Sequence, residues 1–294
     1  MKKKIENWLY QHARDLEQAR YDYHFKQGDK ARIIKTLRQY QNTDGGFAHG
    51  LEPDFTTPAS NPIDTWTATR ILDELSLESA HPMIKRILDY LEKTPHMKDG
   101  LYYFRIPDNN NHPHAEWWHY EPGKETEGYN PTASLLGFRF VHTATGAKKD
   151  QIRLEVDQAI RYFLNNQITE MHELRSFVEL YHYIRPAINH PMFFEKLKDQ
   201  ILMTVEKDPA MWFDSYCAKP SQLIINPETP GYEIMKPLVF KEHTILKQQI
   251  ETRDIWEIEW TWGQYPEAFL KAKQAWEGIR ALENLIRFKR FSEL

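Results

Sequence analysis

The chain has 294 residues, with 38 basic and 42 acidic side chains and a formal net charge of −4 at pH 7. That balance provides no basic face for phosphates, so we expect no nucleic-acid partner. The single cysteine, Cys217, excludes an internal disulfide framework and indicates a reducing compartment. No stretch approaches the roughly 18 apolar residues of a membrane span, so we expect a cytoplasmic protein without one.

Aromatic residues make up 13% of the chain, with nine tryptophans, although the mean hydropathy is −0.69. A disordered chain of this polarity would carry few aromatic residues. Polar helix surfaces around an aromatic-rich interior account for both values, and the composition therefore predicts a folded protein.

Apolar residues recur at helical spacing along most of the chain. In chain order, the stripes with this spacing are Ile5, Trp8, Leu9, Ala13 and Leu16; Ile33, Ile34, Leu37 and Tyr40; Met83, Ile84, Ile87, Leu88 and Leu91; Val156, Ile160, Phe163 and Leu164; Leu174, Phe177, Val178 and Tyr181; Phe194, Leu197, Ile201 and Val205; and Trp276, Ile279, Leu282, Leu285 and Ile286. Alternation typical of strands is confined to two short runs, at 101–106 and 223–225. The pattern predicts an all-α fold. Since no linker rich in Gly, Ser or Pro interrupts the chain, it also predicts one domain over 1–294.

Two Asn-Pro pairs, Asn61-Pro62 and Asn130-Pro131, are each predicted to start a helix, with asparagine as the N-cap and proline in the first turn. Each pair follows a long polar loop, and each loop follows a helix that ends near an Asp-Gly element, at 44–47 and at 99–100. This order recurs at roughly 50 to 70 residues and indicates an internal repeat of helical hairpins.

The first Asp-Gly element lies in the string Q-N-T-D-G-G-F. Adjacent glycines permit backbone conformations that end a helix tightly, and an aspartate before them can bind the freed amides of the turn. The phenylalanine can pack into the junction between two helices. We interpret the set as turn architecture; its members are Gln41, Asp44, Gly45, Gly46 and Phe47.

The spacing Leu37-x3-Gln41-x3-Gly45-x-Phe47 resembles the QW-type repeat of squalene cyclases and protein prenyltransferases, with phenylalanine where tryptophan is usual. The longer string at 41–60 is similar to bacterial proteins labelled prenyltransferase-like or squalene-cyclase-like. The resemblance is specific over 37–75 and looser over 81–145. It implies an α/α toroid, a barrel of helical hairpins in which inner and outer helices alternate around a central cavity.

The motifs that carry the chemistry of these families are missing from the chain. It has no D-x-D-D string, with which class II cyclases protonate an alkene, and no D-D-x-x-D string for a diphosphate. The nearest counterpart of the zinc site of protein prenyltransferases, Asp214 and Cys217 with His243, has a different spacing. The resemblance therefore implies the fold and not prenyl transfer.

The loop after the turn, H-G-L-E-P-D, contains a first group of candidate catalytic residues. Pro53 stiffens this loop and Gly50 lets it bend, so its polar side chains are expected to be held in place. If the loop lies at the mouth of the cavity, Glu52 and Asp54 form an acid/base pair that His49 assists. The alternative is a solvated acidic loop that caps the next helix.

The second candidate loop, H-P-H-A-E-W-W-H-Y-E-P at 112–122, holds the equivalent position in the next repeat. Trp117 and Trp118 could form a stacking wall for a sugar ring or an apolar chain, with His114 and Glu116 as polar anchors. Alternatively, the tryptophans close one end of the toroid as core and the histidines are exposed. The pair His112-x-His114 could hold a metal, but we expect none, and the sequence identifies no cofactor.

The third aromatic segment, W-E-I-E-W-T-W at 256–262, precedes the last predicted helix, and we interpret it as the seam that closes the ring. Three functions remain open for a small-molecule substrate or ligand in the central cavity. The first is an enzyme that uses carboxylates on a carbohydrate or another polar ring substrate; the second is isoprenoid binding or processing; the third is a non-catalytic binding or scaffold protein. A polar cavity favours the first function, an apolar cavity the second, and a filled cavity the third.

Overall fold

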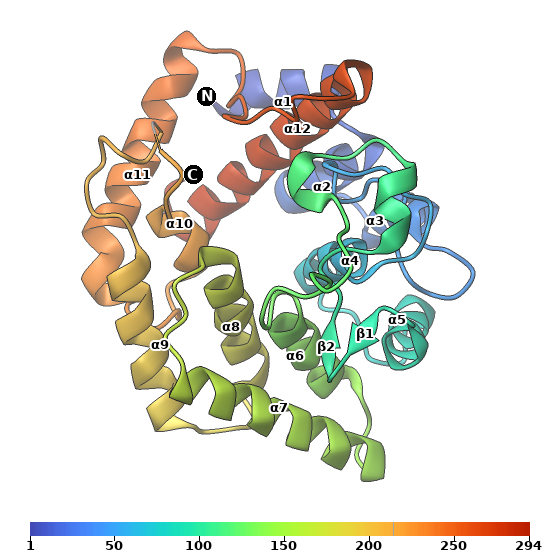
Figure 1. The fold of residues 1–294 in the computed structure, drawn as a ribbon. Helices are drawn as coiled ribbons and strands as arrows, with labels where there is room; N and C mark the ends of the chain where they lie inside the picture. Colours follow the sequence, from blue (N-terminus) through green and yellow to red (C-terminus); the bar gives the residue numbers. More distant parts are fainter. Residues whose placement is uncertain (214) are drawn as a thin grey trace.

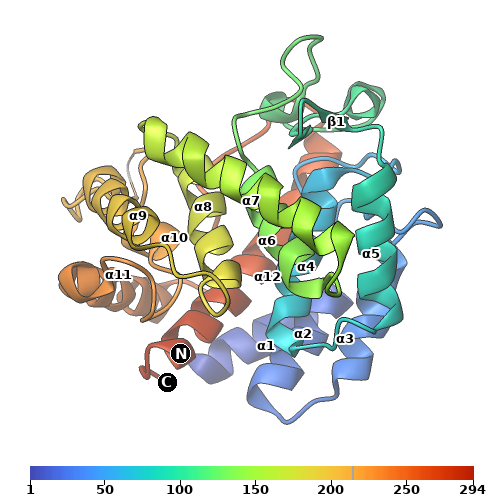
Figure 2. The ribbon, with the colours of Figure 1, turned by 90° about the horizontal axis from the view of Figure 1, so that it is seen from below.

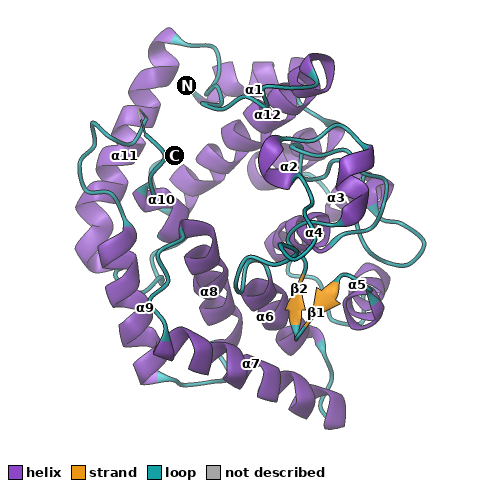
Figure 3. Cartoon of the chain, in the orientation of Figure 1, coloured by secondary structure: helices purple, strands orange, loops and turns teal. Residues whose placement is uncertain are grey.

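The structure, a computed structural model, describes residues 1–213 and 215–294, and helices dominate it (Figures 1 and 3). The twelve α-helices in these residues are α1 (Lys2–His12), α2 (Asp15–Phe25), α3 (Lys30–Leu37), α4 (Pro62–Leu75), α5 (Pro82–Lys93), α6 (Thr132–His142), α7 (Ala147–Asn165), α8 (Met171–Ile184), α9 (Pro191–Thr204), α10 (Pro220–Leu223), α11 (Tyr232–Thr252) and α12 (Pro266–Arg290). Three short 3-10 helices are η1 (Arg38–Tyr40), η2 (Pro107–Asn111) and η3 (Glu116–Trp118). The all-α prediction is confirmed at this level.

Several consecutive helices pack in pairs, such as α2 with α3 and α10 with α11, and the even-numbered helices from α4 to α10 also contact one another in sequence. Helix α6 contacts α4, α7 and α8, while α8 contacts α9 and α10. In Figure 1, α7, α9 and α11 lie on the outside of the molecule, with α6, α8 and α10 on their inner side. The last helix, α12, packs against α1 and α2, so the two ends of the chain meet, as the view in Figure 2 also shows.

The predicted helix start at Asn61-Pro62 is confirmed, and the one at Asn130-Pro131 is wrong by one residue. The Asn61 side chain accepts a hydrogen bond from the backbone N–H of Asp64, with Pro62 as the first residue of α4. Helix α6 instead begins at Thr132 with Pro131 as its N-cap. The Asn130 amide oxygen accepts from Ser176 Oγ of α8, at 3.4 Å, so this side chain binds another helix.

The two strand-like runs become largely irregular structure or helix. Only Leu101–Tyr102 of the first run forms a strand, β2, paired antiparallel with β1 (Met97–Lys98). In the second run, Leu223 ends the short helix α10 and Ile224 is its C-cap. Both side chains are fully buried, so these apolar residues fill the core without needing a sheet. The stripe predicted over 5–16 is also divided, because the backbone turns at Ala13 and Arg14 between α1 and α2.

Apolar side chains gather in four clusters that follow the helix pairs. The largest lies among α6, α7, α8, α9 and α11; a second joins α2 to α6, and a third joins α1, α11 and α12. The fourth is small and lies between the loops that follow α3 and β2 and the segment before α12, where it includes Phe55, Trp118 and Trp262. No helix in the described residues is both long and apolar enough to cross a membrane.

Candidate functional site

The Asp-Gly-Gly-Phe element folds as a tight turn whose polar groups bond to one another. The Asp44 carboxylate accepts from the Gly46 N–H at 3.0 Å and from Ser60 Oγ at 2.8 Å. The Gln41 side chain donates to the Gly45 carbonyl at 2.9 Å. Gly45 has a φ of +96°, and a Cβ there would lie 2.2 Å from the Arg86 carbonyl oxygen, so this position requires glycine. The Phe47 side chain, which follows the turn, is fully buried.

A central cavity of about 740 Å³ lies among the even-numbered helices. Its lining comes from α2, α4, α6, α8, α10 and α12, together with Leu51 and Glu52 of the loop after the turn. The lining is strongly charged: its arginines and acidic residues are Arg14, Arg20, Arg70, Arg175, Arg287 and Arg290, and Glu17, Glu52, Asp73, Glu74, Glu179 and Glu283. Six cations and six carboxyl groups therefore face one space of small-molecule size.

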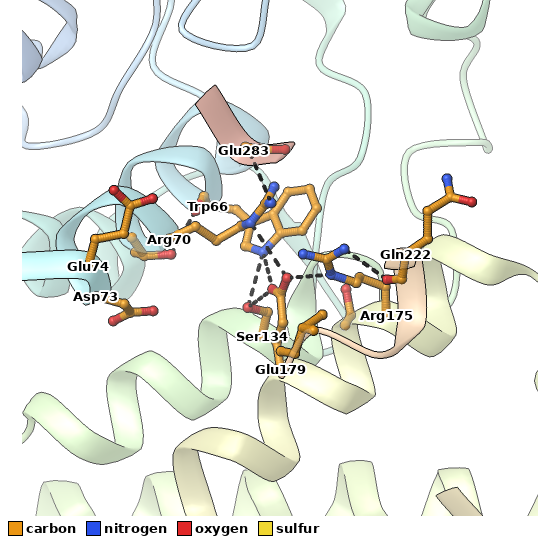
Figure 4. Close-up of polar contacts among 12 residues, drawn as sticks. Trp66, Arg70, Asp73, Glu74, Ser134, Arg175, Glu179, Gln222 and Glu283 are labelled. Atoms are coloured by element: carbon orange, nitrogen blue, oxygen red, sulfur yellow. Dashed lines mark hydrogen bonds and ion pairs between the residues drawn. The ribbon is translucent and has the colours of Figure 1, made fainter. Parts of the chain in front are cut away.

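Glu179 of α8 is the centre of a hydrogen-bond network that joins three helices (Figure 4). Its carboxylate accepts from Trp66 Nε1 at 2.8 Å, from Ser134 Oγ at 2.7 Å and from Arg175 Nε at 3.0 Å. The Arg70 guanidinium lies 3.5 Å from the same carboxylate. Burial opposes the charge on Glu179, but the two arginines and the two neutral donors outweigh it and lower its pKa. The carboxylate of Glu179 is thus ionised, and its hydrogen bonds to three donors and its contact with Arg70 hold it in place.

The two acidic residues at the end of α4 have opposite environments. Burial disfavours the charge on Glu74, yet the ion pair with Arg20, at 2.5 Å, and the hydrogen bond with His24 lower its pKa to about 2. Asp73 is reached by solvent but is crowded by protein, which raises its pKa to about 7 even though the Tyr183 hydroxyl donates to it. Asp73 therefore titrates near neutral pH, while Glu74 stays ionised.

Glu52 is a buried acid at the wall of the cavity. It is 8% exposed, and its carboxyl group has one weak contact, the Asp54 N–H at 3.4 Å. Burial, together with the nearby charges of Asp54 and Asp64, raises its pKa well above the ordinary value. A carboxyl group in this environment retains its proton to a higher pH than an ordinary one, as a proton donor requires.

Asp54, two residues further on, is held by the tryptophan segment that precedes α12. Its carboxylate accepts from Trp262 Nε1 at 2.8 Å and from Trp260 Nε1 at 3.4 Å. Burial raises the pKa of Asp54, and these indole donors oppose that rise. Asp54 is not part of the lining of the central cavity. Asp54 therefore ties its loop to the segment predicted to form the seam.

The two loops that sequence reasoning selected do lie side by side. The Ala115 N–H donates to the Asp54 carbonyl at 2.8 Å, and the Thr56 N–H donates to the Pro113 carbonyl at 3.1 Å. Phe55 forms an antiparallel bridge with His114. Their backbones meet, but only the first loop contributes lining to the central cavity.

The side chains of the second loop divide between the surface and the core. Glu116 and Trp117 are exposed. Trp118 is 6% exposed and packs on Phe104, with ring centroids 4.5 Å apart. His114 is buried, and its ring nitrogens lie 2.6 Å from the His112 carbonyl oxygen and 3.1 Å from His119 Nδ1.

His49 lines a second cavity of about 780 Å³ on the other side of the first loop. Its Nε2 lies 2.9 Å from the Asn42 side-chain oxygen, and its φ is +66°. Arg14 lines both cavities, and its guanidinium donates to the carbonyls of Gly50 and Leu51. The loop is therefore a wall between two spaces, with His49 and Glu52 on opposite sides.

No group of three or more His, Cys, Asp or Glu side chains in residues 1–213 and 215–294 is placed to hold a metal ion. Asp214, the first member of the mismatched zinc pattern, lies outside the described residues. No protein-family model, curated protein or solved structure matches this chain.

Sequence reasoning missed most of the cavity lining, including Arg70, Asp73, Arg175 and Glu179. The sequence of α8 contains one signal for Glu179, because this residue lies directly between Phe177-Val178 and Leu180. In the structure, these three apolar residues and Ser176 are all buried. A charged residue inside such a segment, here Glu179, must be buried and must find partners.

Proposed function

We propose that this chain is an α/α toroid related to the squalene-cyclase and prenyltransferase fold, and that its central cavity binds and converts a polar substrate. Support for the fold comes from the lining of the cavity, which is drawn from every second helix, and from the packing of α12 on α1 and α2. The QW-like spacing at 37–47 adds to this support.

The observation that carries the function is the charged lining of the cavity. An isoprenoid chain in this space would remove water from arginines and carboxylates without replacing their hydrogen bonds, at a cost of several kcal/mol. A carbohydrate or another polar ring offers hydroxyl groups that bind both kinds of side chain, while Tyr183 and Trp276 of the lining offer ring faces. A space of about 740 Å³ also disfavours a scaffold whose cavity is filled by its own side chains.

Glu52 is the proton donor in this proposal. Its raised pKa favours the protonated form, and its place in the lining puts that proton within reach of a bound substrate. Asp73, with a pKa of about 7, is a second proton-handling group in the same cavity. Glu179 serves as a positioning residue, because its contacts fix the guanidiniums of Arg70 and Arg175.

The test is a screen of chromogenic glycosides and oligosaccharides with three proteins: the wild type, Glu52→Gln and Glu116→Gln. We expect turnover to fall by about 10²-fold or more in Glu52→Gln, the range typical of a lost general acid. Glu116→Gln, which changes an exposed side chain outside the lining, is expected to retain wild-type turnover. Equal activity in wild type and Glu52→Gln would remove Glu52 from the mechanism, and loss in Glu116→Gln would return the site to the second loop.

A further inference from the structure

The last turns of α12 place two arginines, three residues apart, in the lining of the central cavity. Arg287 Nη1 donates to Asn284 Oδ1 at 2.8 Å, and Arg290 Nη1 donates to the Ile225 carbonyl at 2.7 Å. Both acceptors are neutral. Within residues 1–213 and 215–294, neither guanidinium has a carboxylate within 4.0 Å.

The other four arginines of the lining are paired with carboxylates. Their ion pairs are Arg14–Glu17 at 2.8 Å, Arg20–Glu74 at 2.5 Å, Arg70–Glu179 at 3.5 Å, Arg70–Glu283 at 3.7 Å and Arg175–Glu179 at 3.0 Å. Arg70 and Arg175 share Glu179, and Arg70 also pairs with Glu283 of α12. The charge of the cavity is uneven because Arg287 and Arg290 of α12 have no such partner among the described residues, and Arg175 of α8 shares its only one with Arg70.

The electrostatics of the nearby groups agree with this uneven charge. Burial, followed by the charges of Arg175 and Arg70, lowers the pKa of Arg290, although Glu74 and Glu283 oppose this. Burial and the charges of Arg185, Arg290 and Arg175 together lower the pKa of His182 to about 4, against the opposing charge of Glu179. His182 is therefore neutral at pH 7 and adds only hydrogen-bonding capacity.

The apparent balance of six arginines and six acids in the lining does not hold at neutral pH. The raised pKa of Glu52 favours its neutral form, and Asp73, with a pKa of about 7, is only partly ionised. The cationic side chains then outnumber the ionised carboxylates. A site that is positive before its ligand arrives favours an anion, and guanidinium groups bind carboxylate and phosphate oxygens through paired, charge-assisted hydrogen bonds.

We propose that Arg175, Arg287 and Arg290 form an oxyanion-binding subsite of the central cavity, which takes a carboxylate or phosphate group carried by the substrate. Asn226 and His182 lie in the same lining and supply neutral polar contacts beside the three guanidiniums. The assignment of this anion to a substrate rests on the proposed function, which it deepens: the polar substrate is an acidic sugar. Binding of an oxyanion at these residues does not depend on turnover.

Equilibrium binding tests the subsite without a known reaction. D-glucuronate, glucose 6-phosphate, inorganic phosphate and neutral glucose are titrated into the wild type by calorimetry, at constant ionic strength. The same titrations are made with the Arg287→Gln/Arg290→Gln double variant and with Lys289→Gln. Lys289 lies on the same helix, but it bonds to the His24 carbonyl and is outside the lining, so this control loses a similar charge elsewhere.

We expect at least one sugar anion to bind the wild type at least about tenfold more tightly than glucose, with a further loss of roughly tenfold or more in the double variant. Lys289→Gln should bind like the wild type. Preference for glucuronate identifies a carboxylate subsite, preference for the sugar phosphate identifies a phosphate subsite, and comparable binding of inorganic phosphate shows that the group itself supplies the affinity. Each of these three preferences supports the subsite, provided that the double variant binds the preferred anion more weakly than the wild type does.

Two results would overturn it. If glucose binds as tightly as the sugar anions and the double variant changes nothing, the anion subsite is wrong while the polar-substrate function stands. If none of the four compounds binds, the subsite and its acidic-sugar substrate both fail.

Folding of the variants can be checked directly. Removing the two cations relieves their burial and their repulsion by other arginines but also removes their attraction to Glu242, Glu74 and Glu283, so the melting temperature of the double variant without ligand is measured beside that of the wild type. Should the double variant fail to fold, Arg290→Gln alone provides the same test, because Arg290 is exposed at the cavity.

Discussion

Two carboxyl groups of one loop, Glu52 and Asp54, face different parts of the molecule and have different uses. Both are buried, and burial raises the pKa of both. Asp54 accepts hydrogen bonds from two indole groups and joins its loop to the tryptophan segment. Glu52 faces the cavity with one weak contact. Burial alone therefore does not separate these two carboxyl groups, whereas their hydrogen-bond partners do: Asp54 is satisfied by indole donors and Glu52 is left with a single weak contact.

The largest stability effect is expected where a satisfied carboxylate holds several partners. Glu179→Ala would leave Arg175 without a carboxylate partner and Arg70 with only Glu283, at a cost of about 3 kcal/mol in the free energy of unfolding. Urea denaturation monitored by tryptophan fluorescence measures this loss. Glu179→Gln, which keeps an acceptor for Trp66 and Ser134, should lose less; an alanine variant as stable as the wild type would contradict the network.

We expect Asp54 to contribute to the stability of the protein and not to turnover. Asp54→Ala would leave the buried Trp262 N–H without its acceptor, which costs about 1 to 3 kcal/mol in stability. The matched variant Asp54→Asn keeps an oxygen acceptor and should lie closer to the wild type. Denaturation curves of the two variants measure the difference, and turnover of the folded Asp54→Asn protein should remain near that of the wild type. A large loss of turnover in Asp54→Asn would make Asp54 part of the chemistry.

The pH dependence of stability should separate Glu52 from its neighbour. Because the folded state raises the pKa of Glu52, the folded protein binds this proton more tightly than the unfolded chain. The resulting stabilisation is full below the unfolded pKa and is lost as the pH rises from there to the folded pKa. Glu52→Gln removes this pH-dependent loss, so its stability relative to the wild type should increase as the pH rises above about 4.5. A pH-independent difference would show that Glu52 has an ordinary pKa.

The smallest effect is expected at Glu116, which lies in an exposed part of the second loop. Glu116→Gln should change the free energy of unfolding by no more than about 0.5 kcal/mol, as is usual for surface substitutions. Thermal denaturation measures this change. A clear destabilisation would reveal a contact of Glu116 in solution that the structure does not contain.

The sequence predicted local features better than it predicted the cavity. Helical stripes, the Asn61 cap and the compact Asp44 turn depend on residues close in the chain, and their physical signals are local. The meeting of the loops around Asp54 and Ala115 followed from the repeat, which places equivalent loops near one another.

The cavity network lies beyond such reasoning, because its partners come from distant helices. Trp66, Ser134 and Glu179 belong to α4, α6 and α8, and 113 residues separate the first from the last. Helical spacing shows which residues share one face of a helix, but it does not show which polar residue of another helix each of them contacts. The helix start at Asn130 was misplaced for a related reason, since that side chain binds Ser176 of a different helix.

The most direct test is the protonation state of Glu52 at neutral pH, measured as an infrared difference spectrum between the wild type and Glu52→Gln. If Glu52 is the proton donor, we expect the carbonyl band of a protonated carboxyl group at pH 7, present in the wild type and absent from the variant. A wild-type spectrum without that band, with an ionised carboxylate signal in its place, would contradict the assignment of Glu52 as the proton donor of the cavity.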